Sequence, residues 1–178
     1  MRLKKIGHVN FRVADQERSK KFYTEVLGLK VAEEDPEHGG VFMTLGEDFH
    51  NVDVSDGRGR MDPATRPPGF VHVAFTVDSH RALREAYVAL LEHGIGVDHA
   101  TNHENQRSIY FKDPDGNGLE IYYEIPGALK IFPNGRSDQD TPLPVSKPGE
   151  PLPDWLFEDD WPRPDQLEAV RARSPLSS

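Results

Sequence analysis

The feature that most constrains the fold is an internal repeat. The stretch HVNFRV, residues 8–13, matches HVAFTV, residues 72–77, at four of six positions. The same ungapped alignment continues to two further matches, Tyr23 with Tyr87 and Leu27 with Leu91. Six coincidences at a constant offset indicate a duplicated structural unit. We therefore expect a fold in which two copies of one supersecondary unit pack together.

Each copy predicts the same order of elements. In residues 8–13 and 72–77, apolar residues alternate with a histidine and other polar or small residues, as in a strand with one packed face. A helical pattern follows each strand and stops at a glycine, Gly28 or Gly94. Further strand-like segments come next, at residues 41–45 and 50–54 in the first copy and 108–111 and 119–123 in the second. The predicted fold is α+β, with two βαβββ modules, residues 1–62 and 67–125, paired into a U-shaped, partly open barrel.

The chain changes character after residue 125. Ten of its 15 prolines lie at or beyond Pro126, a density that prevents regular helices and central strands. Trp155 and Trp161 favour packing, because disordered segments seldom carry tryptophan. Residues 126–178 are thus expected to form a surface extension of the domain, packed or partly disordered, with room for a short helix over residues 165–173.

Charge and composition exclude several functions. A net charge of −9 and a pI near 5.3 argue against nucleic acid and anionic membranes as partners. The chain has no cysteine, so any metal must be held by His, Asp or Glu. No apolar stretch is long enough to span a bilayer, and no signal peptide is evident. A cytoplasmic protein is expected.

Three residues predict a metal site. His8 and His72 occupy the same position in the two copies, and each lies on the polar face of its predicted strand. Packing about a pseudo-two-fold axis would bring them together, and Glu120, within the strand of DPDGNGLEIYYE (residues 113–124), supplies a carboxylate. Two imidazoles and one carboxylate form a facial triad that suits Fe(II), with Mn(II), Zn(II) or Ni(II) as alternatives. The competing interpretation is that all three are ordinary polar strand residues.

The chain also resembles a known family, the vicinal oxygen chelate superfamily, over residues 6–126. The resemblance is carried most specifically by RSIYFKDPDGNGLEIYYE, and also by GHVNFRVAD, FYTEVLGL and GFVHVAFTVDS. That superfamily includes glyoxalase I, fosfomycin-resistance enzymes, methylmalonyl-CoA epimerase and extradiol dioxygenases. The resemblance implies paired βαβββ modules, metal ligands at His8, His72 and Glu120, and a homodimer.

Two residues of the first module bear on the reaction. His50, in GEDFHNVDV, is similar in position to the acid/base histidine of extradiol enzymes. Asp53 stands where glyoxalase I has a fourth, carboxylate ligand, although a role beside the ligands is preferred here. Strand alternation points Asp53 into the pocket and His50 away from it, unless the strand begins after His50 or contains a bulge.

The second module offers further candidates. In a hairpin turning at residues 113–118, Tyr110 would lie across from Glu120, and the resemblance gives it a hydrogen bond to a substrate oxygen. The segment DHATNHENQ, residues 98–106, is expected to be a loop over the substrate, with His103 preferred to His99 as the residue that lines the pocket. The remaining histidines, His38, His80 and His93, are expected in loops or on exposed parts of helices, and no role is assigned to them.

The preferred interpretation is an extradiol-type dioxygenase that cleaves a catechol-like diol with O2, with His50, Tyr110 and His103 as catalytic residues. Two other classes stay open. One is metal-dependent lyase, transferase or isomerase chemistry of the glyoxalase, fosfomycin-resistance or epimerase kind. The other is a non-catalytic binding protein, against which the intact triad counts.

Overall fold

The computed structural model describes residues 1–26, 28–36, 39–56, 69–112, 118–133, 135 and 140–173. The strands of the first module are β1 (Lys5–Arg12), β2 (Lys30–Asp35), β3 (Gly40–Thr44) and β4 (Val52–Ser55). Those of the second module are β5 (Gly69–Thr76), β6 (His99–Asn102), β7 (Gln106–Lys112) and β8 (Gly118–Glu124). The helices are α1 (Gln16–Lys21), continued by the π-helical turn η1 (Phe22–Val26), and α2 (His80–Glu92).

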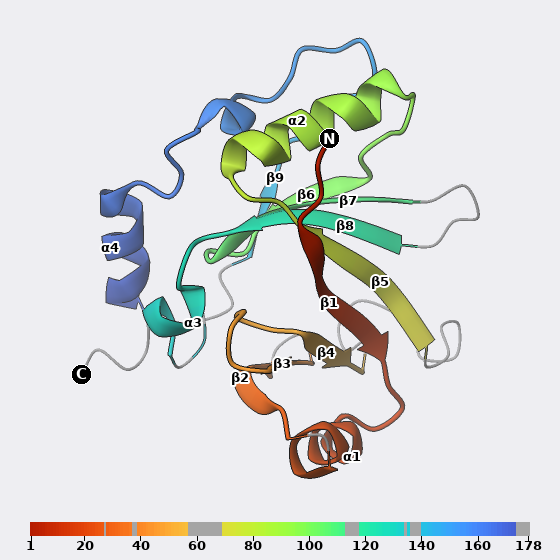
Figure 1. The fold of residues 1–178 in the computed structure, drawn as a ribbon, viewed down its shortest axis with the longest axis vertical. Helices are drawn as coiled ribbons and strands as arrows, with labels where there is room; N and C mark the ends of the chain where they lie inside the picture. The colour runs from red at the N-terminus through yellow and green to blue at the C-terminus, as the bar shows by residue number, and fades with distance from the viewer. Residues whose placement is uncertain are drawn as a thin grey trace.

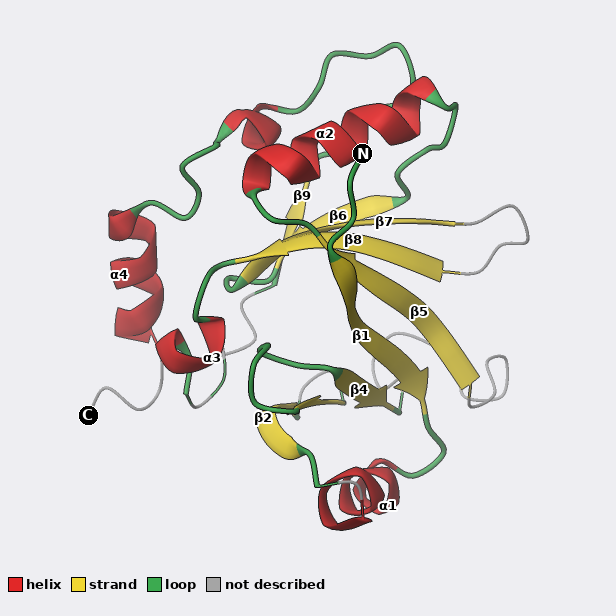
Figure 2. Ribbon diagram, viewed as in Figure 1, coloured by secondary structure: helices red, strands yellow, loops and turns green. Residues whose placement is uncertain are grey.

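These strands form a single mixed sheet in the order β2-β3-β4-β1-β5-β8-β7-β6, with a ninth strand, β9 (Thr141–Leu143), beyond β6. The first and last strands of each module pair in parallel, β1 with β4 and β5 with β8. The sheet curls into a half-barrel, with α1 and α2 at opposite ends of the molecule (Figures 1 and 2). The predicted fold of two paired βαβββ modules is confirmed. Predictions for Leu27, His38, the hairpin turn at residues 113–117 and the module boundary within 57–68 lie outside the described residues.

The two modules meet where β1 pairs with β5 in antiparallel fashion. Val9 lies directly opposite Val73, and these two residues are equivalent in the repeat. The pseudo-two-fold axis therefore passes between them, so residues on either side of this pair approach their own counterparts. This arrangement is what places the two repeat histidines close together.

Helix α2 shows how the sequence determines where a helix begins and ends. The hydroxyl of Ser79 caps its first turn by accepting from the backbone N–H of Ala82. Leu83, Tyr87 and Leu90 lie on its buried face, and Gly94 follows the helix at a φ of 73° that favours glycine. The helix thereby closes the outer face of the second module's sheet.

Described residues beyond 125 pack against both modules. They include α3 (Ala128–Ile131), β9, the 3-10 turn η2 (Asp154–Phe157) and α4 (Pro164–Arg173). Trp155 and Leu156 join the core under α2, and Trp161 packs in a second cluster, whereas Phe157 is exposed. Strand β9 lies at the sheet edge, the position in which proline is tolerated.

One local prediction was wrong. The segment 98–106, expected to be a loop, contains strand β6, which pairs with β7 on one side and β9 on the other. The alternation in this short polar strand is weak, and the pairing with β9 comes from a proline-rich segment that gives little strand signal.

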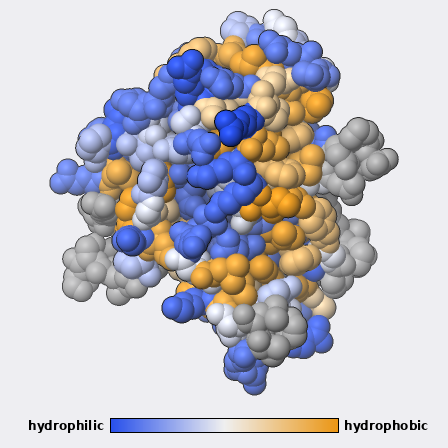
Figure 3. Space-filling view, viewed as in Figure 1, coloured by the Kyte–Doolittle hydropathy of each residue, from blue (hydrophilic) through white to orange (hydrophobic). Residues whose placement is uncertain are grey.

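No helix among the described residues is both long and apolar enough to cross a membrane. On the face shown in Figure 3, hydrophobic side chains gather over β1 and β5, where Ile6 and Phe70 are 60% and 45% exposed.

Candidate metal centre

The two repeat histidines meet across the junction of the modules. His8 on β1 faces Ala74, and His72 on β5 faces Asn10, so the two histidines are diagonal neighbours about the Val9–Val73 pair. Their Nε2 atoms lie 3.1 Å apart. The predicted convergence of the two histidines is therefore present in the structure.

Glu120 completes the group from the adjacent strand. It lies on β8 opposite Ala74 of β5, and its Oε2 is 3.1 Å from His8 Nε2 and 3.0 Å from His72 Nε2. This oxygen is buried and has no hydrogen-bond partner of acceptable geometry among the described residues. Three ligand atoms, one of them this carboxylate oxygen, thus lie within 3.1 Å of one another.

The spacing of these atoms fits a metal ion. Ligand atoms about 2.1 Å from one ion lie about 3.0 Å apart at octahedral right angles and about 3.4 Å apart in a tetrahedron. The observed separations of 3.0–3.1 Å match one face of an octahedron. The side chains of His8 and Glu120 are almost fully buried, whereas that of His72 is 14% exposed, so the group is most accessible beside His72.

The electrostatics of the group keep its carboxylate ionised. Burial by itself raises the pKa of Glu120, but the attraction of the His8 and His72 rings outweighs it and holds the pKa well below its ordinary value. An ionised carboxylate and two imidazoles are the donor set that a divalent cation requires.

His50 and Asp53 lie beside the triad. Strand β4 begins at Val52, after His50, so the alternation that would have turned His50 away does not extend to it. The His50 ring stacks on His8 with centroids 4.1 Å apart, and its Nδ1 is 2.5 Å from Asp53 Oδ1. Burial raises the pKa of Asp53, yet His50, His8 and His72 together lower it.

The position of Asp53 follows from the repeat. Asp53 lies opposite Asn10 in the first module as Glu120 lies opposite Ala74 in the second, and Asn10 and Ala74 are themselves equivalent. Asp53 is therefore the counterpart of Glu120. Its Oδ2 is 3.6 Å from His8 Nε2, which is farther than the Glu120 oxygen, and its other oxygen is held by His50.

Sequence reasoning missed Gln106, which links the two groups. Its amide oxygen lies 3.4 Å from His50 Nε2, and its amide nitrogen donates to Glu120 Oε1 at 3.2 Å and to the Ser108 hydroxyl at 3.1 Å. Gln106, Ser108 and Tyr110 alternate along β7 on one face. Counting back from Tyr110 in two steps of two residues, along the same strand face, would have identified it.

Tyr110 lies opposite Glu120 in the β7–β8 pair, as predicted. Burial and then the Glu120 charge raise the pKa of its hydroxyl well above the ordinary value, so the phenol stays protonated. Both candidate loop histidines contact it: His103 Nε2 is 2.8 Å from its hydroxyl, and the His99 ring stacks on its ring at 4.3 Å. His103 also approaches Asp140, with Nδ1 2.7 Å from Oδ1.

The other histidines lie away from this group. His93 is exposed at the end of α2. His80, expected on an exposed part of the helix, is instead buried among Tyr123, Trp155 and Trp161, because the C-terminal extension covers the start of α2. The sequence does not indicate where that extension packs.

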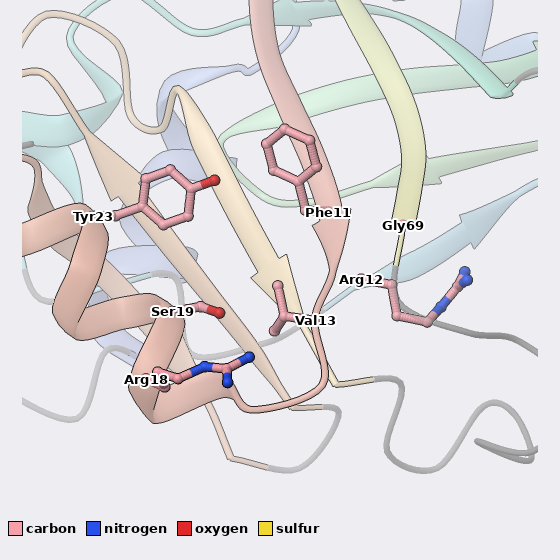
Figure 4. Close-up of a pocket in the computed structure, with 7 residues that line it drawn as sticks. All are labelled: Phe11, Arg12, Val13, Arg18, Ser19, Tyr23 and Gly69. Atoms are coloured by element: carbon pink, nitrogen blue, oxygen red, sulfur yellow. The ribbon is translucent and has the colours of Figure 1, made fainter.

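A cavity of about 400 Å³ lies elsewhere, and it contains none of the predicted site residues. It opens between α1 and the far ends of β1 and β5, and its lining includes Arg12, Arg18 and Tyr23 (Figure 4). We therefore assign the candidate centre from the chemistry of the triad and not from the shape of this cavity.

The fold agrees with comparisons to known proteins. Residues 5–121 match the Glyoxalase/Bleomycin resistance protein/Dioxygenase superfamily. The chain belongs to this superfamily. The superfamily relatives include a biphenyl-2,3-diol 1,2-dioxygenase of Rhodococcus globerulus, 30% identical over 80% of this chain and 76% of the relative. A catechol-2,3-dioxygenase of Bacillus subtilis is also 30% identical, over 68% of this chain but only 42% of its own length.

Other superfamily relatives have a different chemistry. The metallothiol transferase FosB of Staphylococcus epidermidis is 26% identical over 67% of this chain and 84% of its own. Among solved structures, the Mn(II)-bound glyoxalase of Novosphingobium aromaticivorans aligns with a TM-score of 0.61 and 23% identity, covering 83% of this chain and 52% of its own. A homoprotocatechuate 2,3-dioxygenase variant from B. fuscum aligns with a TM-score of 0.56 and 20% identity over 70% of this chain and 33% of its own. These structures show the shared fold.

Proposed function

We propose that the protein is an extradiol-type dioxygenase that opens the ring of a catechol-like diol with O2. The observation that carries the proposal is the triad of His8, His72 and Glu120, whose ligand atoms lie 3.0–3.1 Å apart. The similarity to two diol dioxygenases at 30% identity supports the choice of substrate class.

In this proposal the triad holds Fe(II) on one face. The ion, when bound, would supply a Lewis acid that makes the diol more acidic and a redox centre that couples its electrons to O2. Because only three protein atoms occupy the face, positions remain for both substrates. Mn(II), Zn(II) or Ni(II) would fit the same three donors, and the metal must be identified by measurement.

His50 is the proposed acid/base. Asp53 binds its Nδ1, which fixes the ring orientation and leaves Nε2 as the nitrogen that exchanges a proton. Stacking against His8 keeps the His50 ring beside the triad. Tyr110, on the other side of the triad, is proposed to bind the substrate oxygen nearest to Glu120, with His103 as its hydrogen-bond partner.

A metal-dependent thiol transferase or lyase is the second candidate. The observation in its favour is Asp53, the counterpart of Glu120, which together with His8 and His50 forms a second group of ligand atoms within 4.8 Å of one another. A fourth protein ligand would leave fewer positions for O2. The bond between Asp53 and His50 favours the first candidate, because it occupies the carboxylate.

Metal analysis and a substrate panel test the proposal. The protein is purified without oxygen, loaded with Fe(II) and mixed with catechol, biphenyl-2,3-diol and 3,4-dihydroxyphenylacetate, while O2 uptake and the yellow ring-cleavage product are followed. Colour that requires both Fe(II) and O2 supports a dioxygenase. Bound metal without colour, together with turnover of thiol and fosfomycin, supports the transferase, and ligand binding without metal supports a binding protein.

Assembly and location stay predictions. A homodimer is expected. The surface that a second copy would cover is the exposed hydrophobic strip on β1 and β5 that includes Ile6 and Phe70. Light scattering of the wild type and of Ile6→Lys tests this, since a dimer that uses the strip would dissociate. A cytoplasmic location is likewise part of the proposal.

A further inference from the structure

A side chain of the C-terminal extension reaches the candidate site. Strand β9 pairs with β6 in antiparallel register, with Thr141 opposite Asn102. The next pair in that register is Asp140 with His103, and their side chains meet with Oδ1 2.7 Å from Nδ1. Asp140 lies outside residues 5–121, which match the superfamily, so this contact is supplied by the extension.

His103 in turn contacts the tyrosine beside the triad. Its Nε2 is 2.8 Å from the Tyr110 hydroxyl, and the Tyr110 ring lies edge-on to His72 with centroids 5.7 Å apart. The side chains of His103 and Asp140 are 15% and 27% exposed, whereas Glu120 is fully buried. A line of hydrogen bonds therefore runs from Tyr110, beside the triad, through His103 to Asp140 and toward the surface.

The positions of the protons along this line follow from the chemistry of Asp140, the carboxylate at its outer end. An ionised carboxylate only accepts hydrogen bonds, so His103 Nδ1 must carry a proton. In a neutral imidazole the other nitrogen is then an acceptor, which means that the Tyr110 hydroxyl donates to His103 Nε2. The lone pairs of the Tyr110 oxygen are then left to accept a hydrogen bond from a substrate hydroxyl bound beside the triad.

We propose that Asp140 is a positioning residue that fixes the tautomer of His103 and so prepares Tyr110 to accept a proton from the substrate. The substrate O–H bond breaks and a new O–H bond forms on Tyr110, while the original Tyr110 proton moves to His103 Nε2. The imidazolium that results is paired with Asp140, and no electrons are gained or lost. The tautomer is a property of the chain itself, whereas the proton transfer rests on the proposed function.

The tautomer is tested by nitrogen NMR of the histidine side chains in the full-length protein, both as purified and loaded with Zn(II), which avoids broadening by iron. We expect the Nδ1–H form of His103 in the wild type and in Asp140→Glu. In Asp140→Ala we expect the Nε2–H form that free imidazole prefers. An Nε2–H form in the wild type, or an unchanged Nδ1–H form in Asp140→Ala, would overturn the proposal.

Kinetics test the proton transfer. Asp140→Ala should lower kcat by about 10- to 100-fold, the usual effect of losing a group that orients a functional histidine, with KM changed less than about threefold. The matched control is Asp98→Asn, which removes an exposed carboxylate at the other end of β6. An equal loss in the control, or a change confined to KM, would contradict the proposal. If the wild type turns over no diol, the proposed function fails, and the NMR result still decides the tautomer.

Discussion

His8 and His72 are equivalent residues of a repeat, and their Nε2 atoms lie 3.1 Å apart although the residues are not paired across the sheet. They are diagonal neighbours on either side of Val9 and Val73, through which the pseudo-two-fold axis passes. Glu120 joins them from β8, and its counterpart Asp53 remains bound to His50. Duplication thus places two histidines and two carboxylates at equivalent positions. The set becomes asymmetric because His50 binds one of the carboxylates, Asp53.

Loss of a triad residue should weaken metal binding strongly. Glu120→Gln removes the carboxylate, and His72→Ala removes an imidazole. Each is expected to weaken metal affinity by more than about 10- to 100-fold, which is the loss that follows mutation of a residue hydrogen-bonded to a ligand. Elemental analysis and calorimetric titration give the measurement. The control is His93→Ala, which removes the exposed histidine that caps the end of α2 and should bind one metal per chain. A triad variant that retains full affinity would rule out this site.

Metal binding should also stabilise the fold. A ligand present at 100 times its Kd and bound only by the native state adds about 2.7 kcal/mol to the free energy of unfolding. Thermal unfolding with and without a chelator measures this, and the chelator should lower Tm in the wild type but not in Glu120→Gln. Equal Tm values for wild type with and without chelator would contradict the prediction.

His50→Ala should separate metal binding from turnover. The change leaves Asp53 without its bond at Oδ1 and with Oδ2 3.6 Å from His8 Nε2, so the carboxylate becomes available to the metal. We expect metal affinity to be kept or raised and kcat to fall by about 10²- to 10⁴-fold, the range for a lost acid/base. Asp53→Asn provides the comparison, since it lowers turnover without offering a new ligand. A parallel loss of affinity in His50→Ala would show that His50 acts as a ligand.

The sequence predicted the fold and the triad for the same reason. Repeat positions are related by symmetry, so matching His8 to His72 also brings them together in space. The antiparallel pairing of β7 with β8 then places Glu120 opposite Tyr110, as expected for the two strands of a hairpin. Such inferences need only local patterns and one duplication.

Other features depend on contacts that no local pattern contains. Asp140 reaches His103 because a proline-rich segment pairs with β6, and His80 is buried because Trp155 and Trp161 return over α2. Both contacts join parts of the chain more than 35 residues apart through an irregular segment. Tertiary packing, and not propensity, decides such positions.

His80 should make stability depend on pH. Burial and then the nearby Arg107 lower its pKa to about 4, while the unfolded chain has the ordinary value of about 6.5. Between these values the unfolded state binds more protons, so stability is complete above about pH 6.5 and falls as the pH drops toward 4, by up to about 3 kcal/mol. His80→Gln keeps an acceptor for Arg107 and removes the titration, so its stability should vary less over this range. Chemical unfolding at several pH values measures the difference, and His93→Gln should behave as the wild type does.

Gly7 should be required because Tyr122 occupies the space beside it. A Cβ at Gly7 would overlap the Tyr122 hydroxyl, whereas one at Gly96 would meet nothing within 4 Å. Tyr122 is fully buried and its ring lies 5.3 Å from that of His8, so it cannot move without disturbing a triad residue. We expect Gly7→Ala to cost about 1–3 kcal/mol, as overpacking does, and also to weaken metal affinity. Gly96→Ala should change neither quantity. If Gly7→Ala unfolds like the wild type and binds metal equally well, the packing of Tyr122 against β1 does not support the site.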